Sequence, residues 1–530
     1  MEQVTVKYPV GIQNFESLRL EGYTYVDKTA YVWQMAHLGR YYFLSRPRRF
    51  GKSLLLSTIE AYFEGKKELF DGLAIADLEK EWKQYPVFHL DLNAAQYKTG
   101  EDLKQMLNLH LTRWEKIYGS ELHEVTVSDR FAGVIERAFK QTGSQVVILV
   151  DEYDKPLTQN LINDDVQDEM RGILKAFYGV MKSCDRYIKM GFLTGVTKFS
   201  KVSVFSDLNN IDDISMWDRY IAACGMTEQE IRDNFDSEVG LLAEAEKMSK
   251  DECYAKLQRQ FDGYHFCVDS VGIYNPYSII NTLNKRKFGD YWFETGTPTL
   301  LVDLLKNANY NLNDLVDGDV SSQLLASVDS VRENPISVIF QSGYLTIKGY
   351  NKEFDEYQLG FPNDEVKSGF VNFLLPLYTN YKQNTTQFGI ARFVREVRSG
   401  QPEAFMNRLQ AMMADTDYRI VGDSELYFQN FLFVFFRLLG LYVEVERTTS
   451  DGRMDMIVKT PDYIYILEFK LNQTADVALQ QIEEKGYAQP FAVDTRTLYK
   501  IGINFNTDKR CIDDWKIASY SSTKDKTSAG

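Results

Sequence analysis

The segment 46–53 constrains the fold of this chain more than any other stretch. It follows the apolar run 41–44 and precedes apolar residues at helical spacing between 54 and 63. A strand, a tight loop and a helix in this order place backbone N–H groups and the positive end of a helix dipole around a phosphate. We therefore expect all eight residues to form a phosphate-binding loop: Arg46, Pro47, Arg48, Arg49, Phe50, Gly51, Lys52 and Ser53.

The last three residues of this loop have the chemistry that a triphosphate site requires. Gly51 lets the backbone approach the ligand, Lys52 would reach the outer phosphates, and the Ser53 hydroxyl would ligate Mg²⁺. The usual pattern opens with a glycine five positions before Gly51, where this chain has Arg46, so the match is partial. The alternative is a basic turn that happens to end in Gly-Lys-Ser.

Two acidic residues follow a second apolar run. The β-branched run 146–150 predicts a parallel strand buried on both faces, and Asp151 and Glu152 come directly after it. Ligands bind at the carboxyl ends of such strands. Asp151 could hold Mg²⁺ beside Ser53, and Glu152 could deprotonate the water that attacks the γ-phosphate. A strand capped by solvated acids is the alternative, but it leaves the upstream Gly-Lys-Ser loop unexplained.

A third run, 188–193, predicts another strand, and polar residues follow it. Thr194 is the first candidate for a residue that senses the γ-phosphate, and Thr197 is the second. A simple Thr-Gly turn explains these residues equally well.

Composition limits the partners and the compartment. The chain of 530 residues has 60 basic and 75 acidic residues, a net charge of −15, which excludes a wholly basic nucleic-acid coat and leaves only a local patch. Its five cysteines lack metal-ligand spacing, which favours a reducing compartment. We find no apolar run of membrane-spanning length and no signal-peptide pattern, so we expect a cytoplasmic protein with no membrane partner.

A second group of charged residues lies near the C-terminal end. We expect a helix from Glu425 and then three strands, near 442–446, 453–458 and 463–469. Strand alternation puts Glu468 and Lys470 on one face with apolar residues, where charges are costly unless paired or metal-bound. Asp455 could share Mg²⁺ or Mn²⁺ with Glu468 near a scissile phosphate, and Lys470 could assist the attacking water. A salt bridge between neighbouring strands is the alternative.

The first half of the chain resembles the predicted AAA-ATPase-like family, whose members are bacterial and usually carry a C-terminal nuclease-like domain. The resemblance rests on 46–53, 150–154 and 194–197, and it extends to Asp262-Gly263-Tyr264 and to 274–278. It implies ATP as the ligand and an ASCE-type sheet, in which an extra strand separates the loop strand from the Asp-Glu strand. The segment 87–92 is the strand that we expect in that position.

The C-terminal residues resemble the PD-(D/E)XK nuclease superfamily in their order, although Met454 stands where the superfamily's name has a proline. The resemblance implies that Asp455 and Glu468 are metal ligands and that Lys470 is catalytic. It also implies an auxiliary acid and two supporting groups, at Glu425, Gln481 and Tyr487.

We therefore predict an α/β protein of five parts. They are an AAA-like ATPase core (1–225), a helical lid (226–310), a winged-helix-like module (311–382), a helical connection (383–419) and a PD-(D/E)XK nuclease-like domain (420–520). The predicted function is ATP binding and hydrolysis coupled to metal-dependent cleavage of nucleic acid, with DNA favoured. The alternatives are a nucleotide-controlled switch whose nuclease fold does not cut, and an ATPase whose nuclease fold only binds DNA ends. The sequence does not decide whether the chain forms a homo-oligomer.

Overall fold

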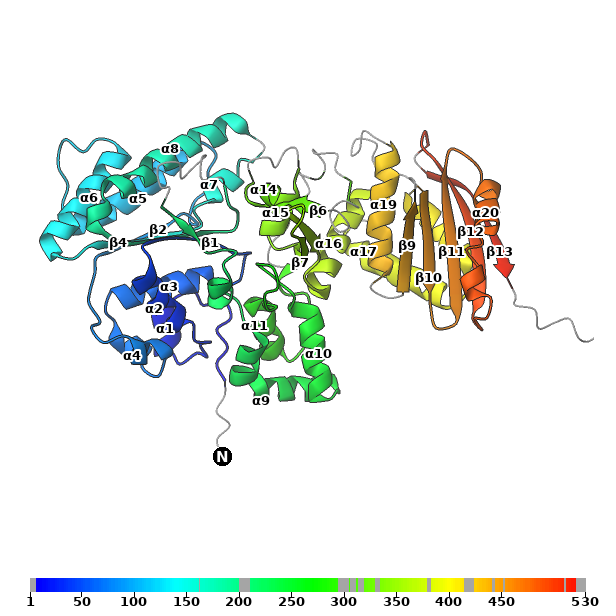
Figure 1. Cartoon of the computed structure of the whole chain (residues 1–530), viewed down its shortest axis with the longest axis horizontal. Coiled ribbons are helices and arrows are strands. Elements are labelled where there is room, and N and C mark those ends of the chain that lie inside the picture. Colours follow the sequence, from blue (N-terminus) through cyan, green and yellow to red (C-terminus); the bar gives the residue numbers. More distant parts are fainter. Residues whose placement is uncertain are drawn as a thin grey trace, which may run out of the picture. The chain divides into compact units, whose positions relative to one another are not determined.

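The chain forms two compact units (Figure 1). Unit 1 comprises Met1–Leu301 and Asp317–Glu365, and unit 2 comprises Val302–Val316 and Val366–Gly530. The computed structural model describes residues 6–161, 163–199, 210–293, 305, 311–312, 319–328, 334–378, 383–413, 424–440, 444–450, 453–509 and 511–520. The five-part division stays a prediction, because the two units do not resolve its inner boundaries.

A parallel sheet of five strands is the centre of unit 1. Its order is β2-β3-β4-β1-β5. The strands are β1 (Tyr41–Ser45), β2 (Val87–Asp91), β3 (Val146–Asp151), β4 (Ile188–Gly195) and β5 (Asp212–Asp213). The parallel sheet confirms the predicted fold class.

The position of the extra strand was predicted wrongly. β4, and not the segment 87–92, lies between the loop strand β1 and the Asp-Glu strand β3. β2 is an edge strand, and its residues alternate between buried and half-buried, whereas nearly every residue of β4 is buried. A central parallel strand is covered on both faces, which explains the difference in burial.

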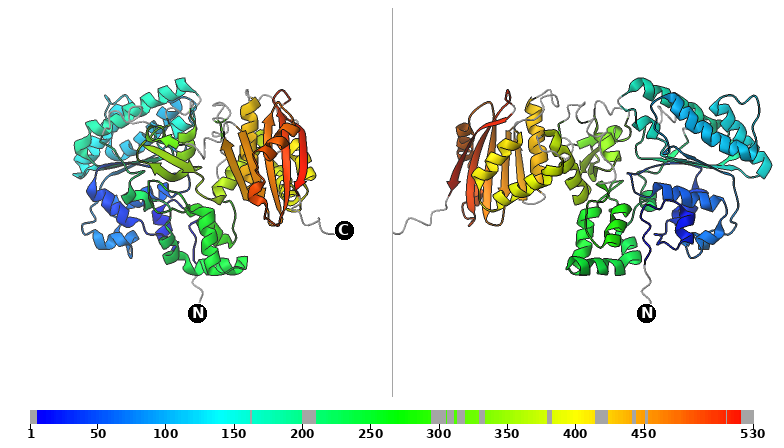
Figure 2. Two further views of the ribbon diagram at one scale, coloured as in Figure 1. Left: turned by 45° about the vertical axis from the view of Figure 1, so that its right-hand side comes forward. Right: turned by 180° about the vertical axis from the view of Figure 1, so that it is seen from behind.

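Helices cover both faces of this sheet (Figures 1 and 2). On one face lie α5 (Gly100–Tyr118), α6 (Val127–Thr142) and α8 (Asp164–Ser183), and on the other α1 (Phe15–Leu20), α2 (Thr29–Leu38), α3 (Lys52–Phe63) and α4 (Ala74–Leu78). The short α7 (Lys155–Thr158) follows β3. Thr99 and Thr126 begin α5 and α6 with capping boxes, which satisfy two of the N–H groups at each helix start.

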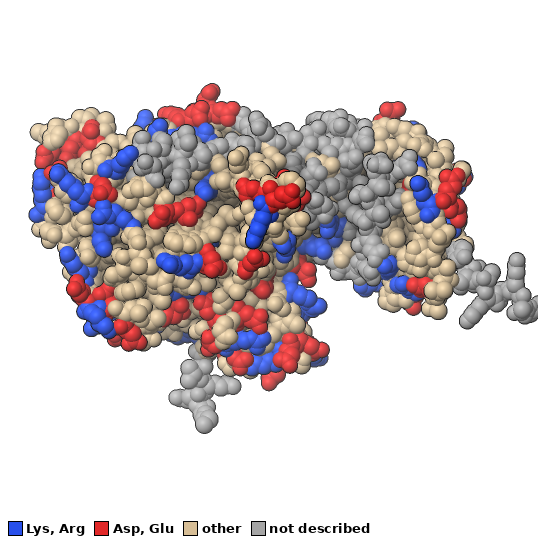
Figure 3. Space-filling model, in the orientation of Figure 1, with Lys and Arg blue, Asp and Glu red and all other residues tan. Residues whose placement is uncertain are grey.

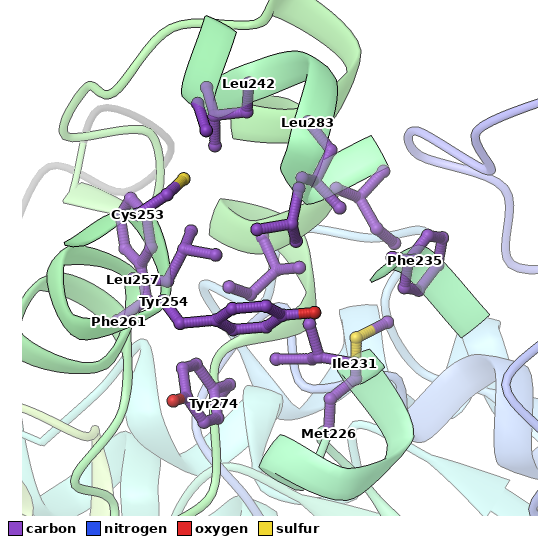
Figure 4. Close-up of a cluster of buried hydrophobic side chains, with 14 residues drawn as sticks. Met226, Ile231, Phe235, Leu242, Cys253, Tyr254, Leu257, Phe261, Tyr274 and Leu283 are labelled. Atoms are coloured by element: carbon purple, nitrogen blue, oxygen red, sulfur yellow. The ribbon is translucent and has the colours of Figure 1, made fainter. Parts of the chain in front are cut away.

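Two smaller groups of elements complete unit 1. The helices α9 (Glu228–Glu246), α10 (Lys250–Phe261) and α11 (Pro276–Lys285) pack around their own apolar core (Figure 4). An antiparallel sheet in the order β6-β8-β7 contains β6 (Asp319–Ser321), β7 (Thr346–Asn351) and β8 (Glu356–Gly360), together with α14 (Ser322–Leu325) and α15 (Ile336–Gln341). Helices in the predicted lid are confirmed for these residues, while the winged-helix interpretation stays a prediction.

Unit 2 is built on a mixed sheet in the order β13-β12-β11-β10-β9. Its strands are β9 (Glu444–Ser450), β10 (Arg453–Lys459), β11 (Tyr463–Leu471), β12 (Thr497–Asn506) and β13 (Cys511–Tyr520). Its helices are α16 (Asp364–Tyr378), which begins in unit 1, α17 (Gln383–Arg398), α18 (Pro402–Met413), α19 (Ser424–Leu439) and α20 (Ala475–Glu484). Of the strand pairs described in this sheet, β11 and β12 pair in parallel and the others antiparallel, and α20 connects β11 to β12.

Among the described helices, none is long and apolar enough to cross a membrane. All five cysteines are free thiols. Acidic and basic side chains are interspersed over the described part of the face shown in Figure 3. This distribution agrees with the exclusion of a wholly basic nucleic-acid coat.

Gly502 on β12 allows α20 to lie directly on the sheet. A Cβ atom at this position would be 2.3 Å from the Ala475 carbonyl oxygen and 2.8 Å from the Leu479 backbone nitrogen. Both atoms belong to the backbone, so the helix itself would have to move. We expect Gly502→Ala to lower the free energy of unfolding of unit 2 by about 1–3 kcal/mol, the usual cost of overpacking, measured by urea unfolding.

The control is Gly172→Ala in α8, where an added Cβ meets nothing within 4 Å. Alanine is the better helix former there, so this variant should be neutral or more stable by up to about 1 kcal/mol. Equal stability losses in the two variants would contradict the close packing of α20 on Gly502.

Candidate functional site

The loop after β1 turns sharply into α3. Arg49 and Gly51 both adopt the left-handed backbone conformation, with φ of 67° and 93°. Gly51 is the N-cap of α3, and among the described side chains none caps this helix start. The first N–H groups of α3 and its positive dipole end therefore remain available to an anion, as a phosphate-binding loop requires.

Lys52 and Glu152 meet at this edge of the sheet. Lys52 is 5% exposed, and its Nζ donates to the carbonyl oxygens of Arg46 (3.0 Å) and Pro47 (3.2 Å). The same Nζ lies 3.9 Å from Glu152 Oε1. Two segments far apart in the sequence thus bring an ammonium group and a carboxylate together.

Asp151 completes this group at the end of β3. It is 5% exposed, and burial raises the pKa of its carboxyl above the usual value, while a hydrogen bond from Ser53 opposes that shift. Ser53 lies in the first turn of α3 and Asp151 at the end of β3, at the same edge of the sheet, where both could bind one cation. Their donor set, a hydroxyl and a carboxylate, is one that Mg²⁺ prefers.

Arg46 is a structural residue of the loop. Its guanidinium is 1% exposed, donates to the carbonyl oxygens of Ser45 (2.9 Å), Ser215 (2.6 Å) and Ile221 (3.4 Å), and lies 4.0 Å from the Phe266 ring centroid. Burial lowers the pKa of Arg46 to about 10. The sequence places Arg46 in the phosphate-binding loop, and the structure directs its side chain into the protein. Arg48 and Arg49 are exposed.

The two threonine candidates both use their hydroxyl groups within the protein. Thr194 lies on β4, and its Oγ1 donates to the Leu44 carbonyl oxygen at 2.8 Å. Thr197 Oγ1 donates to Asp154 Oδ2 at 2.6 Å. A phosphate-sensing role for Thr194 remains a prediction, and it would require this hydroxyl to act as an acceptor or to change partner.

The candidate nuclease residues lie on β11 and α20 in unit 2. Glu468 is fully buried, and its Oε1 accepts a hydrogen bond from Lys470 Nζ at 2.6 Å. Lys470 Nζ also donates to Gln481 Oε1 at 2.6 Å. Glu468 Oε2 has no hydrogen-bond partner among the described residues. A buried carboxylate oxygen without a donor is costly unless a cation satisfies it, so this atom fits a metal ligand.

Backbone register places Asp455 on β10 directly opposite Glu468 on β11. The two residues therefore occupy paired positions on neighbouring strands. The side chains of Asp455 and Glu425 lie outside the described residues. Among the side chains that are described, no group of three His, Cys, Asp or Glu residues could hold a metal ion. Tyr487 packs against the apolar cluster beneath α20, and its supporting role in the site stays a prediction.

Comparisons with known proteins match both parts of the chain. A family model described as Predicted AAA-ATPase matches residues 9–205, and one described as PD-(D/E)XK nuclease superfamily matches residues 423–515. An uncharacterized protein in the vnfD 5' region of Azotobacter chroococcum mcd 1 is 35% identical over 525 residues, which is 97% of this chain and 99% of that protein. The chain belongs to the predicted AAA-ATPase family. Both resemblances suggested by the sequence motifs are thereby confirmed.

The site of this predicted AAA-ATPase includes a residue that the sequence analysis missed. Asp154 is 1% exposed and accepts hydrogen bonds from the backbone N–H of Val196 (3.2 Å), the N–H of Thr197 (2.7 Å) and the Thr197 hydroxyl. Tyr153 donates its hydroxyl to the Thr197 carbonyl oxygen at 3.0 Å. The residues after Glu152 therefore fix the end of β4 beside the site. In the sequence, the signal that could have revealed Asp154 is an acidic residue two positions after Glu152.

The pKa of Asp154 gives a pH-dependent prediction. Burial and the nearby Glu152 carboxylate raise this pKa to about 6 from an ordinary 3.8, against the hydrogen bonds from Thr197. The folded chain therefore holds the proton more tightly than the unfolded chain. The stability from this group is fully present below about pH 4 and is lost as the pH rises through about 6.

We expect Asp154→Asn to remove this dependence. Between pH 4 and pH 6.5, wild-type unit 1 should lose stability relative to the variant by up to about 1.4 kcal/mol per pH unit, measured by urea unfolding. Comparing the two proteins at each pH cancels the contributions of the titrating groups that do not interact with Asp154. Parallel stability profiles would show that Asp154 titrates at its ordinary value.

Proposed function

We propose that this predicted AAA-ATPase binds and hydrolyses Mg-ATP in unit 1 and cleaves phosphodiester bonds of nucleic acid, with DNA favoured, in unit 2. The observation that carries the proposal is the meeting of Lys52 and Ser53 with Asp151 and Glu152 at one edge of a parallel sheet. Separate segments supply a phosphate-binding group, two cation ligands and a base.

The residues of unit 1 have distinct roles in the proposed ATPase. Lys52 exchanges its bonds to the loop carbonyls for the outer phosphates of ATP. Ser53 and Asp151 hold Mg²⁺, which neutralises charge on the phosphates. Glu152, 3.9 Å from Lys52, orients the attacking water and accepts its proton.

The residues of unit 2 suit metal-dependent hydrolysis. Asp455 and Glu468 would hold Mg²⁺ or Mn²⁺, which lowers the pKa of bound water and stabilises charge on the phosphate. Lys470 is held in place by Glu468 and Gln481 and points its positive charge at the same site. Its role is to stabilise the attacking hydroxide or the negative charge that develops on the phosphate.

Nucleotide binding provides the direct test of unit 1. Calorimetric titration with Mg-ATP should show saturable binding, and Lys52→Ala should weaken it about 100-fold or more, because the ammonium group bonded to the loop carbonyls is removed. Lys66→Ala is the matched control, since Lys66 pairs with Glu16 and Glu64 on the surface. Equal affinities for wild type and Lys52→Ala would refute this site.

A non-cleaving switch is the second candidate function, and one observation favours it. Lys470 and Glu468 already form a buried ion pair, which satisfies one oxygen of the carboxylate without any metal. In this case nucleotide binding would control an interaction surface, and unit 2 would recognise a partner without cutting it. Metal binding by Glu468 separates the two functions.

A further inference from the structure

Two sequence motifs have no role in either proposed site. The first is 262–264, at the end of α10, and the second is 274–278, at the start of α11. The Asn275 side chain caps α11 by accepting hydrogen bonds from the N–H groups of Tyr277 (2.9 Å) and Ser278 (3.2 Å). Both motifs extend from the packed core of α9, α10 and α11, which supports them rigidly (Figure 4).

Residues of this region contact three successive residues of the phosphate-binding loop. Trp292 Nε1 donates to the Arg48 carbonyl oxygen at 2.9 Å. The centroid of the Tyr277 ring lies 5.1 Å from the Arg49 guanidinium. The Tyr264 ring meets the Phe50 ring edge-on, with the ring centroids 4.8 Å apart. The outer side of the loop is thus held by residues outside the sheet. A change in the loop backbone must alter these contacts.

The same region also holds the first turn of α16. Both carboxylate oxygens of Glu365 are used: Oε2 accepts from the Ser278 hydroxyl and Oε1 from the Trp292 backbone N–H, each at 2.7 Å. Glu365 is 1% exposed, so these contacts replace its water shell. Gly263 lies against Pro362 so closely that a Cβ atom would be 2.2 Å from the Pro362 carbonyl oxygen.

We propose that Tyr264, Ser278 and Trp292 are positioning residues that couple the phosphate-binding loop to the first turn of α16. Trp292 connects the two directly, with its side chain bonded to the loop and its backbone bonded to Glu365. Unit 1 ends at Glu365, and the chain enters unit 2 within α16. Nucleotide bound at Lys52 thereby changes the conformation of the first turn of α16, the helix through which the chain reaches the nuclease-like unit.

The mechanism follows from the bonds of Lys52, and it rests on the proposed nucleotide binding. Lys52 donates to the carbonyl oxygens of Arg46 and Pro47. A triphosphate competes for the same ammonium group, which frees these carbonyls and lets the loop backbone shift. Close-packed contacts pass such a shift on because they leave little free volume to absorb it.

Hydrogen–deuterium exchange of the full chain tests this coupling. With Mg²⁺ and a non-hydrolysable ATP analogue, peptides covering 362–374 should change their exchange rate about threefold or more. Trp292→Phe keeps an aromatic ring but removes the donor to Arg48, so this variant should bind the analogue and lose most of the change. Trp217→Phe is the matched control, because Trp217 is 44% exposed and should leave the response intact.

Glu365 provides a second pair of variants. Glu365→Gln retains an oxygen for Trp292 and gains an amide that can donate to Ser278, so the exchange response should survive. Glu365→Ala removes both hydrogen-bond acceptors and should abolish the exchange response. Identical responses in Glu365→Gln and Glu365→Ala would refute the role of this carboxylate.

The outcomes separate the coupling from the site on which it rests. Analogue binding by wild type with unchanged exchange at 362–374, or an undiminished response in Trp292→Phe, overturns the coupling alone. A wild-type chain that shows no analogue binding in calorimetry overturns the proposed ATP site and the coupling with it.

Discussion

Glu152→Gln should reduce the rate of ATP hydrolysis by about 10²–10⁴-fold while leaving ATP affinity nearly unchanged. Glutamine keeps the shape of the side chain but cannot accept the proton of the attacking water. In the proposed complex Lys52 bonds to the phosphates whether or not residue 152 is charged, so binding does not depend on the Glu152 charge. Steady-state phosphate release, together with calorimetric affinity, separates the two effects.

Glu64→Gln is the control for this variant, because Glu64 is a surface carboxylate paired with Lys66. It should hydrolyse ATP at the wild-type rate. Unchanged turnover in Glu152→Gln would remove Glu152 from the reaction, and loss of affinity together with turnover would indicate a role in binding instead.

Lys470→Ala should abolish nuclease activity, with a loss of about 10²-fold or more. The ammonium group is 7% exposed and is held at 2.6 Å from both Glu468 and Gln481, so its position is fixed before substrate arrives. Cleavage of labelled single- and double-stranded DNA and RNA with Mg²⁺ or Mn²⁺ measures the effect. Lys500→Ala is the control: Lys500 lies on the neighbouring strand β12 and pairs with Glu483.

The metal itself gives a readout that does not depend on cleavage. If Glu468 is a ligand, Mn²⁺ should stabilise unit 2 and raise its melting temperature. At a Mn²⁺ concentration of a hundred times the dissociation constant, the added stability is about 2.7 kcal/mol. Glu468→Gln should lose this shift, because a neutral amide is a weaker ligand. A wild-type chain that Mn²⁺ does not stabilise would favour the non-cleaving switch, in which the Glu468–Lys470 ion pair is purely structural.

Local patterns predicted much of each site. The strand, loop and helix around Lys52 follow from a short motif, and strand alternation correctly put Glu468 and Lys470 on one face, where Lys470 donates to Glu468. The order of the strands could not be read in the same way. β4 enters between β1 and β3 because of long crossover connections, and such pairing leaves no trace in the local spacing of residues.

The structural roles of Arg46 and Asp154 depend on partners that are distant in the sequence. Arg46 occupies a glycine position of the motif, yet its side chain is turned inward by the carbonyl groups of Ser215 and Ile221. Asp154 holds the N–H groups at 196 and 197. Their roles depend on which segments meet in the folded chain, so composition and spacing could not reveal them.

The cleavage rate of a labelled nucleic acid by the full chain, with Mg²⁺ or Mn²⁺ and with or without ATP, tests the central claim most directly. The account predicts metal-dependent cleavage whose rate changes with ATP in wild type and not in Lys52→Ala. No cleavage under any of these conditions, or a rate that ATP leaves unchanged in wild type, would contradict it.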